Sequence, residues 1–292
     1  MIKFNRNYKL ILELNDGGGA VIIEPPLTVQ FNVNKSLLSD NCTMDISIYN
    51  LGIALRQRIF HDRFDVTNYR RCILEGGYGK NLSVLFVGNI YEANSARQGT
   101  NMITNVIASS GIFDVRATRS YQTIKSNSTQ EDILKSLIAD FPNLSKNNPV
   151  FGDLPTTKTT RATTVMDNTW NAIQILTAPA LPSIQDEKVV VLQNDEALKG
   201  TLSVIDISTG LLETPKRNDS YLTITTLFEP NIAMGQYVKL VSTTEPAYNG
   251  NYKVMAIQHT GIISEATSGD CRTILGLLTD GKTFKYKIVN AQ

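Results

Sequence analysis

The chain contains two histidines, His61 and His259, which lie far apart in the sequence. Asp62 follows His61, and an aspartate can orient an imidazole. Serine and threonine hydroxyls are plentiful as nucleophiles, so the residue types allow a hydrolytic triad. No Gly-x-Ser-x-Gly turn is present to hold a nucleophile, however. His259 lies in a strand pattern between Gln258 and Thr260, and we interpret it as a half-exposed strand residue. We therefore predict no catalytic residue.

Adjacent carboxylates are the residue types that hydrolyse glycosides. Glu131-Asp132 lies at the start of a predicted helix, where acids interact favourably with the helix dipole and need no other role. Asp186-Glu187 and Asp195-Glu196 flank a short strand pattern, and we interpret both as solvent-exposed turns. The sequence therefore predicts no glycosidase centre.

Cofactor and metal motifs are also missing from the sequence. Gly17–Gly19 and Gly76–Gly79 match neither the P-loop nor the dinucleotide-binding pattern, so both clusters are predicted to form hairpin turns. Cys42, Cys72 and Cys271 are odd in number and widely spaced, which favours buried free thiols over disulfides or metal ligands. We predict no cofactor and no metal.

The aromatic residues do not predict a ligand-binding surface. Trp170 has the helical spacing of a core residue. Tyr91, Tyr121, Tyr221 and Tyr248 are too scattered along the sequence to form a platform for bases or sugars.

Composition describes an ordinary globular protein. The 292 residues are 42% hydrophobic and 19% charged and carry a net charge of +1. This length allows roughly two or three domains. The near-zero net charge argues against affinity for nucleic acid through phosphate neutralisation. The first 14 residues do not resemble a signal peptide and no long apolar stretch follows, so we expect a protein made in the cytoplasm without a membrane anchor.

Hydrophobic periodicity predicts a mainly β (α+β) protein with a small α/β insert. Residues 1–118 contain several runs with a period of two, and one short helix is expected at 51–60. Residues 119–200 contain two helical patterns, one capped by Thr129 and one that begins near Thr163 and holds Trp170. Residues 201–292 return to strands, with Asn249-Gly250 predicted as a tight hairpin turn.

The last third of the chain contains three characteristic segments in order, TGLLETP, LFEPNIAMGQYVKL and NGNYKVMAIQHTG. They resemble the C-terminal barrel of tail baseplate hub proteins of bacteriophages and phage-like contractile machines. The matching positions are Thr209, Gly210, Leu211, Pro215, Pro230, Gly235, Val238, Leu240, Asn249, Gly250, Tyr252, Val254 and His259.

The N-terminal region resembles the same family in the segments FNVNKSLLSDNCTMDISIYNL and LEGGYGKNLSVLFVGNIYEANSARQGTNMITNVIASSG. The matching positions are Phe31, Lys35, Ile48, Asn50, Leu51, Gly77, Tyr78, Phe86, Gly88, Ile90 and Gly99. Together the two regions cover roughly two-thirds of the chain in the family's order, and this shared order is more informative than either motif alone.

The resemblance implies two tube-protein-like antiparallel β-barrel domains, at 1–118 and 201–292, with the α/β insert at 119–200 between them. It implies a structural protein rather than an enzyme, located in the virion tail baseplate and assembled in the host cytoplasm. The expected assembly is a homotrimeric ring that joins the hexameric tail tube protein to the trimeric central spike protein and contacts other baseplate proteins. DNA is expected to pass through the lumen without specific binding.

Two further expectations follow. Barrel edges near 27–33 and 222–228 are predicted to pair between subunits. The alternative function is a host-surface or peptidoglycan-binding or peptidoglycan-degrading tail module, which would require exposed aromatics and acids clustered on loops.

Overall fold

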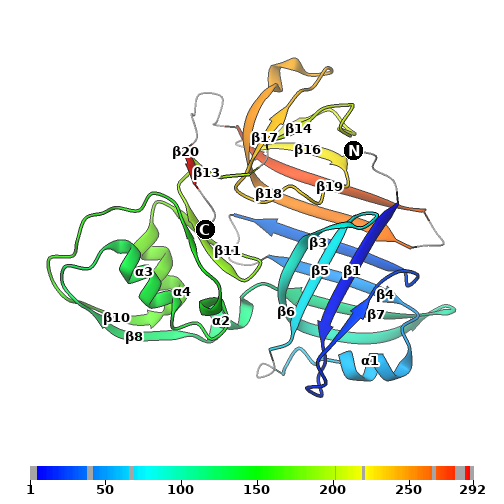
Figure 1. The fold of residues 1–292 in the computed structure, drawn as a ribbon, viewed down its shortest axis with the longest axis horizontal. Coiled ribbons are helices and arrows are strands. Elements are labelled where there is room, and N and C mark those ends of the chain that lie inside the picture. The colour runs from blue at the N-terminus through cyan, green and yellow to red at the C-terminus, as the bar shows by residue number, and fades with distance from the viewer. Residues whose placement is uncertain are drawn as a thin grey trace.

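Alternating apolar and polar residues form strands near both ends of the chain, and these strands meet in one large sheet (Figure 1). The computed structural model describes residues 5–37, 42–65, 69–200, 202–218, 221–264, 268–279 and 287–289. The strands are β1 (Arg6–Glu13), β2 (Ala20–Ile23), β3 (Val29–Ser36), β4 (Thr43–Tyr49), β5 (Arg71–Tyr78), β6 (Asn81–Gln98), β7 (Asn101–Ser109), β8 (Arg119–Ile124), β9 (Val150–Phe151), β10 (Thr163–Asn168), β11 (Leu181–Gln185), β12 (Lys188–Leu192), β13 (Glu196–Leu198), β14 (Ser203–Ile205), β15 (Lys216–Asn218), β16 (Tyr221–Leu227), β17 (Tyr237–Leu240), β18 (Gly250–Ile263), β19 (Ser268–Leu278) and β20 (Lys287–Val289). The α-helices are α1 (Ile53–Ile59), α2 (Ile112–Ala117), α3 (Gln130–Ile138) and α4 (Thr169–Thr177), with 3₁₀ turns at Leu144–Lys146 and Pro246–Tyr248.

The large sheet joins the N-terminal and C-terminal strands through the pair β3–β18. Its order is β15-β16-β19-β18-β3-β4-β7-β6-β5-β1-β2, and β17 with its partner β14 lies beside β18. At the join Val33 lies opposite His259, and Phe31 lies opposite Gly261. The mainly β prediction is confirmed. Among the described residues no strand pair closes either half into a barrel, and the two halves share one open sheet.

The edges predicted for subunit pairing are not edges of this sheet. β3 is hydrogen-bonded on both sides, to β4 and to β18. β16 is paired with β19 along its whole length, and its other side is covered by β15 and by a bridge from Leu211 to Thr226. The prediction at 27–33 and 222–228 was wrong because alternation identifies a strand but says nothing about which strands lie beside it.

One hydrophobic core contains residues from both halves of the chain. At its centre the Phe228 ring lies 6.0 Å from the Phe31 ring on β3 and 6.0 Å from the Tyr78 ring on β5. The Tyr78 hydroxyl also donates to the Phe228 carbonyl oxygen at 2.7 Å. A Cβ atom at Gly76 would lie 2.6 Å from Leu85 Cδ1 and 3.1 Å from Phe228 Cζ. Gly76 therefore serves close packing within β5, and the predicted turn of that glycine cluster is formed by Gly79 and the residue after it.

A second core lies within the segment that follows α2. It holds apolar side chains of α3, α4, β8, β11 and β12, with Trp170 buried among them. Thr129 caps α3, with its hydroxyl accepting from the Asp132 amide and the Asp132 carboxylate accepting from the Thr129 amide. The N-terminus of α4 was predicted too early: β10 occupies Thr163–Asn168, and Asn168 Oδ1 caps α4 by accepting from the Trp170 amide at 2.9 Å.

Two further features complete the fold. β17 and β18 are joined by a long loop with a 3₁₀ turn, so the tight hairpin predicted at Asn249-Gly250 is wrong. Asn249 has φ −66°, so it does not adopt the left-handed conformation of a tight turn. Its side-chain oxygen accepts a hydrogen bond from the Ser242 amide and so links the two ends of the loop. None of the helices in the described part of the chain is both long and apolar enough to cross a membrane.

The two cores lead to a prediction about unfolding. Phe228→Ala should destabilise the large sheet by about 3–5 kcal/mol, since it removes a buried ring between strands of both halves. Trp170 is the single tryptophan and lies in the second core. For Phe228→Ala we expect the unfolding midpoint measured by far-ultraviolet circular dichroism to fall. The midpoint measured by tryptophan fluorescence should fall less. Ile173→Ala is the matched control and should shift the fluorescence midpoint more. Equal shifts of both signals in both variants would contradict two separate cores.

Candidate functional site

The residues considered for catalysis do not form a common cluster. The His61 backbone forms a bridge to Ala93, and Asp62 Oδ1 accepts from the Phe64 amide at 3.0 Å. Burial and the nearby Arg70 guanidinium lower the pKa of His61. Within the described ranges, no group of three or more His, Cys, Asp and Glu side chains could hold a metal ion.

His259 is buried, so its interpretation as half-exposed was wrong. Its exposed fraction is 2%, its Nδ1 lies 2.9 Å from Thr273 Oγ1, and its ring meets Phe228 edge-on at 5.8 Å. Burial, with a smaller effect of the Lys35 ammonium, lowers the pKa of His259 to about 3. The imidazole is therefore neutral at ordinary pH and acts as a core residue.

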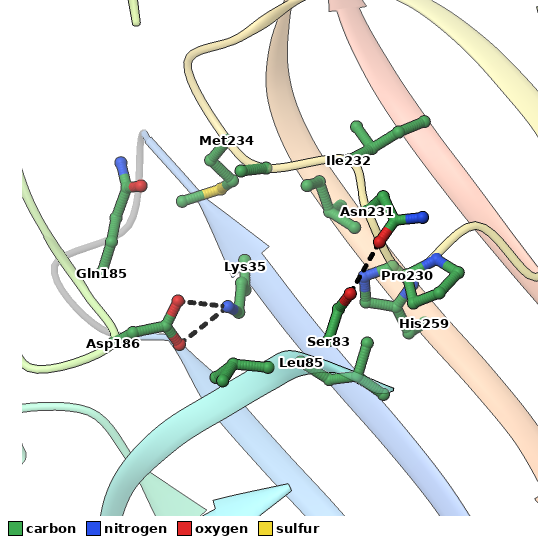
Figure 2. A pocket seen from close by; sticks show the side chains of 13 residues that line it. Lys35, Ser83, Leu85, Gln185, Asp186, Pro230, Asn231, Ile232, Met234 and His259 are labelled. Carbon is green, nitrogen blue, oxygen red and sulfur yellow. Dashed lines mark hydrogen bonds and ion pairs between the residues drawn. The ribbon is translucent and has the colours of Figure 1, made fainter. Parts of the chain in front are cut away.

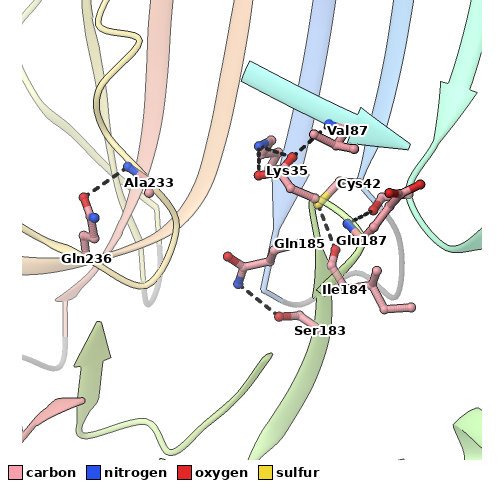
Figure 3. A network of polar contacts seen from close by, with 11 residues as sticks. Lys35, Cys42, Val87, Ser183, Ile184, Gln185, Glu187, Ala233 and Gln236 are labelled. Carbon is pink, nitrogen blue, oxygen red and sulfur yellow. Dashed lines mark hydrogen bonds and ion pairs between the residues drawn. The ribbon is translucent and has the colours of Figure 1, made fainter. Parts of the chain in front are cut away.

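The most concentrated polar contacts surround the turn between β11 and β12. Asp186 and Glu187 form this two-residue turn with φ values of 48° and 62°, a conformation that costs energy for residues other than glycine. Lys35 Nζ donates to both carboxylate oxygens of Asp186 at 2.7 Å, and the Val87 amide donates to Oδ1 at 3.0 Å (Figure 3). The turn is thus held by groups of β3 and β6, and the prediction of a solvent-exposed turn was wrong.

Glu187 adds contacts to two more strands. Its carboxylate accepts from Arg71 Nε of β5 at 3.1 Å, and its amide donates to Ser110 Oγ, just after β7, at 3.0 Å. Burial raises the pKa of Glu187, and the Arg71 guanidinium only partly opposes this effect. Because its ionised form is penalised by burial, Glu187 fixes geometry more than it adds stability at neutral pH.

The start of β4 also contacts this hairpin, since Cys42 Sγ donates to the Ile184 carbonyl oxygen at 3.2 Å (Figure 3). The prediction of buried free thiols is confirmed for Cys42, Cys72 and Cys271. Burial raises the pKa of Cys42 to about 11, so this thiol is protonated and inert. One hairpin of the second core therefore receives polar contacts from or beside β3, β4, β5, β6 and β7. We call this set of contacts the hairpin junction.

A cavity of about 200 Å³ lies beside the hairpin junction (Figure 2). Lys35 and Asp186 line one side, and Ser83, Asn231 and His259 line the other. On that second side Ser83 Oγ donates to Asn231 Oδ1 at 2.6 Å. The cavity lies where β3, β6, β18 and the loop before β17 meet.

A second buried acid was also misassigned. Glu196 is buried, and its carboxylate accepts from the Gln193 amide at 2.8 Å and from the Asp153 amide, while Asp195 is exposed as predicted. Lys253 of β18 is buried beside this turn and donates to the Gln193 carbonyl oxygen at 2.8 Å. Burial lowers the pKa of Lys253 to about 8, against the opposing effect of Glu196 and Asp195.

Lys35 could have been found from the sequence. It occupies an inward position in the alternation that begins with Val29, Phe31 and Val33, and its exposed fraction is 9%. A lysine at an inward position requires a nearby anion. The sequence does not show which anion, because Asp186 is 151 positions away.

On the four central strands of the sheet, the side chains that point away from the core are mostly uncharged. We define the polar face by the outward positions of the four central strands: Gln30, Asn32, Asn34 and Ser36 of β3; Thr43, Asp45, Ser47 and Tyr49 of β4; Ala256, Gln258, Thr260 and Ile262 of β18; and Asp270, Arg272, Ile274 and Gly276 of β19. Its charged residues are Asp45, Asp270 and Arg272, and the last two form an ion pair at 2.8 Å. Amides bond across strands, as in Gln258 to Asn32 at 2.9 Å.

Solved structures with this fold are phage tail proteins and related secretion components. A 43 kDa tail protein of prophage MuSo2 from Shewanella oneidensis has a TM-score of 0.64 at 8% identity, covering 94% of this chain and 97% of that one. A tail protein from Neisseria meningitidis MC58 has a TM-score of 0.64 at 12% identity, covering 95% and 98%. The E. coli c3393 protein, a type VI secretion component described as similar to the T4 tail proteins gp27 and gp5, has a TM-score of 0.59 at 9% identity, covering 91% and 76%. The fold therefore belongs to the tail-protein class.

The chain belongs to the baseplate hub family of phage tails, since the family described as Baseplate hub gp41 matches residues 8–265. As a member of this family it is a structural component of the virion tail. No curated protein matches the chain in sequence. The absence of enzymatic activity stays a prediction.

The hairpin junction leads to a prediction about stability. Asp186→Asn should lower the free energy of unfolding by about 3 kcal/mol, because it leaves the buried Lys35 without its counterion. Lys35→Met combined with Asp186→Asn should recover most of the loss in chemical denaturation. Asp16→Asn, which breaks the exposed pair with Arg58, is the matched control and should have a much smaller effect. If the double variant is as unstable as the single one, the buried charge is not the cause.

His259 leads to a prediction about pH. Its pKa is about 3 when folded and about 6.5 when unfolded, so the unfolded state takes up the proton first as the pH falls. Its contribution to stability is complete above pH 6.5 and decreases towards pH 3, by roughly 2 kcal/mol at pH 5. We expect His259→Gln to remove this part of the acid dependence, measured by urea unfolding at each pH. Parallel pH profiles of variant and wild type would contradict a neutral buried imidazole.

Proposed function

We propose that the chain forms a homotrimeric hub ring that joins the tail tube protein to the central spike protein and lets DNA pass. The observation that carries this proposal is the single sheet with an apolar face on a shared core and a polar face of low charge. A channel lined by such a face would not hold the phosphate backbone, because retention requires arrays of lysine and arginine. Membership of the baseplate hub family supports the same role.

The order of strands supports two comparable halves within one chain. From the β3–β18 join, β3, β4, β7 and β6 follow on one side, and β18, β19, β16 and β15 follow on the other. We propose that 1–118 and 201–292 act as two tube-like barrel units, with 119–200 as an insert on the outside. Three chains would then present six similar units to a six-fold tube. Other baseplate proteins bind outside the ring, and assembly takes place in the host cytoplasm.

The last residues of β6 offer an edge for ring closure. Residues 94–98 are exposed, and among the described residues the His61–Ala93 bridge is the last backbone pairing on the outer edge of β6 before them. β6 and β7 are joined by a two-residue turn with Gly99 at φ 60°. In such a hairpin the residues flanking the turn form a hydrogen-bonded pair, so the backbone groups of Ser95 and Arg97 point away from β7.

The other end of this row of strands is β15, whose three residues are exposed. We propose that residues 94–98 of one copy lie beside the β15 end of the next copy. Contacts between two different surfaces are heterologous, and they close into a ring when the rotation between copies is a third of a turn.

This arrangement predicts that Arg97→Pro abolishes the ring and leaves the monomer folded. Proline removes an amide at the open edge without removing a β6–β7 hydrogen bond. Light scattering should give a trimer for the wild type and a monomer for Arg97→Pro, and the far-ultraviolet circular dichroism spectra of the two proteins should agree, because the monomer keeps its fold. The unfolding midpoint of the variant should fall only by what is lost with subunit association. Arg97→Ala is the matched control and should remain trimeric, because it keeps the amide.

Electron micrographs of the wild type should show a three-fold ring with a central hole. A wild-type chain that remains monomeric at every concentration would overturn the ring. If Arg97→Pro still forms trimers, the ring stands, but the proposal that residues 94–98 form the contact between copies is overturned.

A further inference from the structure

A small two-stranded sheet, formed by β8 and β10, lies apart from the large sheet (Figure 1). We call it the β8–β10 ribbon (Arg119–Ile124 and Thr163–Asn168). One of its faces is covered. Ser120 Oγ bonds to Asp140 Oδ2 and to Thr169 Oγ1, Gln122 Nε2 donates to Asp140 Oδ2 at 2.8 Å, and Ile124 packs into the second core. The ribbon is therefore held firmly from one side.

The opposite face is open and carries two large apolar side chains. Tyr121 and Met166 are direct cross-strand partners with exposed fractions of 73% and 69%. Thr123 and Thr164, the next pair on this face, lie with their hydroxyl oxygens 3.2 Å apart. An exposed aromatic and an exposed methionine side by side form an apolar centre of the kind found at protein interfaces.

Cations lie at both ends of this face. Arg119 is at one end, with Arg116 just before it, and Lys125 continues the alternation at the other end. The loop that holds Arg161 runs beside the Lys125 end, as the bond from the Asn127 amide to the Thr159 carbonyl shows. All four cations are exposed, and within the described residues none of them forms an ion pair with an acid.

The acids of the ribbon do not offset this charge on the open face. Asp140 is bonded to the covered face, and Asp167 lies opposite Ser120, which also belongs to the covered face. Asp167 Oδ1 accepts from the Asn168 amide at 2.6 Å. The open face is therefore positive at its ends and apolar at its centre, over a length of about 20 Å for six residues of strand.

The outer edge of β10 is also open. The Thr169 amide donates to the Thr118 carbonyl at 3.2 Å, which fixes the phase of the antiparallel ladder. With this phase the backbone groups of Thr164 and Met166 point away from β8. Apart from their pairing with each other, β8 and β10 make no backbone hydrogen bond to a strand within the described part of the chain. An open edge of this kind accepts an added strand.

We propose that the β8–β10 ribbon is a docking surface for an extended acidic segment of another protein. The segment adds a strand to β10 at Thr164 and Met166, covers Tyr121 and Met166 with apolar side chains, and places carboxylates beside Arg119 and Lys125. Single-stranded nucleic acid fits less well, because this face has one aromatic ring where successive bases need several, and nucleotides do not match the spacing of an open strand edge. The proposal does not depend on ring formation, since the ribbon does not include the β6 and β15 edges.

The test uses the full-length protein and labelled peptides of about nine residues, the length of a short added strand. One peptide alternates Glu with Val and Thr, a second has Lys in place of Glu, and a third is the acidic peptide with N-methylated backbone amides. A single-stranded oligonucleotide of similar length is the fourth probe. We expect fluorescence anisotropy to show binding of the acidic peptide alone, with affinity that decreases as salt increases.

Two pairs of variants test the contacts. Arg119→Glu with Lys125→Glu should weaken binding of the acidic peptide about tenfold or more, whereas the matched control Lys80→Glu with Lys239→Glu should not. Thr164→Pro removes an outward amide and should also weaken binding about tenfold, whereas Thr164→Val keeps the amide and should bind normally. Thermal unfolding of each variant checks that the fold is retained.

The proposal is overturned if the acidic peptide binds no better than the basic one, or if the ribbon variants bind like the wild type. Tighter binding of the oligonucleotide that depends on Arg119 and Lys125 would identify a nucleic-acid surface and would overturn it as well. The same assays on Arg97→Pro separate this proposal from ring formation. Peptide binding by a monomeric Arg97→Pro protein would support the docking surface whatever the fate of the ring.

Discussion

The pairing of β3 with β18 is the constraint on which the rest of the structure depends. It joins strands that are more than 200 positions apart, and its register decides which side chains of both halves face the core. Val33 and His259 face inward as a pair, and Asn32 and Thr260 face outward as a pair. A slip of one residue would exchange these faces. The shared core and the polar face are therefore two consequences of one register.

The hairpin junction serves a different purpose from the core. Burying Lys35 and Glu187 removes charge from water at considerable cost, and apolar residues of similar volume would give comparable or better stability. Polar contacts, however, have directions that apolar contacts lack. A turn held from several strands, with two residues at positive φ, can occupy one orientation only. The junction thus helps to fix how the second core sits on the sheet, and the docking surface that we propose on the β8–β10 ribbon would need such a fixed orientation.

The sequence predicts features with local causes and misses those with distant ones. Alternation predicted the strands, and the Thr129 cap predicted α3, because both signals lie within a few residues. The three buried thiols followed from cysteine number and spacing. Asp186-Glu187 was misread because two adjacent acids in a turn are usually solvated, and their partners Lys35 and Arg71 lie over a hundred positions away. The same limit explains the misplaced sheet edges, since pairing is a property of the whole fold.

The net charge of +1 hides how charge is distributed in this chain. Three charged residues lie on the polar face, two of them paired with each other, so its hydrogen-bonding groups are mainly neutral. Four exposed cations that form no ion pair with an acid in the described part of the chain flank the open face of the β8–β10 ribbon. A net charge near zero is therefore compatible with two different surfaces. The polar face would bind polyanions weakly, and the open face of the β8–β10 ribbon would attract acidic groups. The interaction of this protein with a charged partner therefore depends on which side chains of each strand face outward at the contact surface. The net charge of the chain does not predict it.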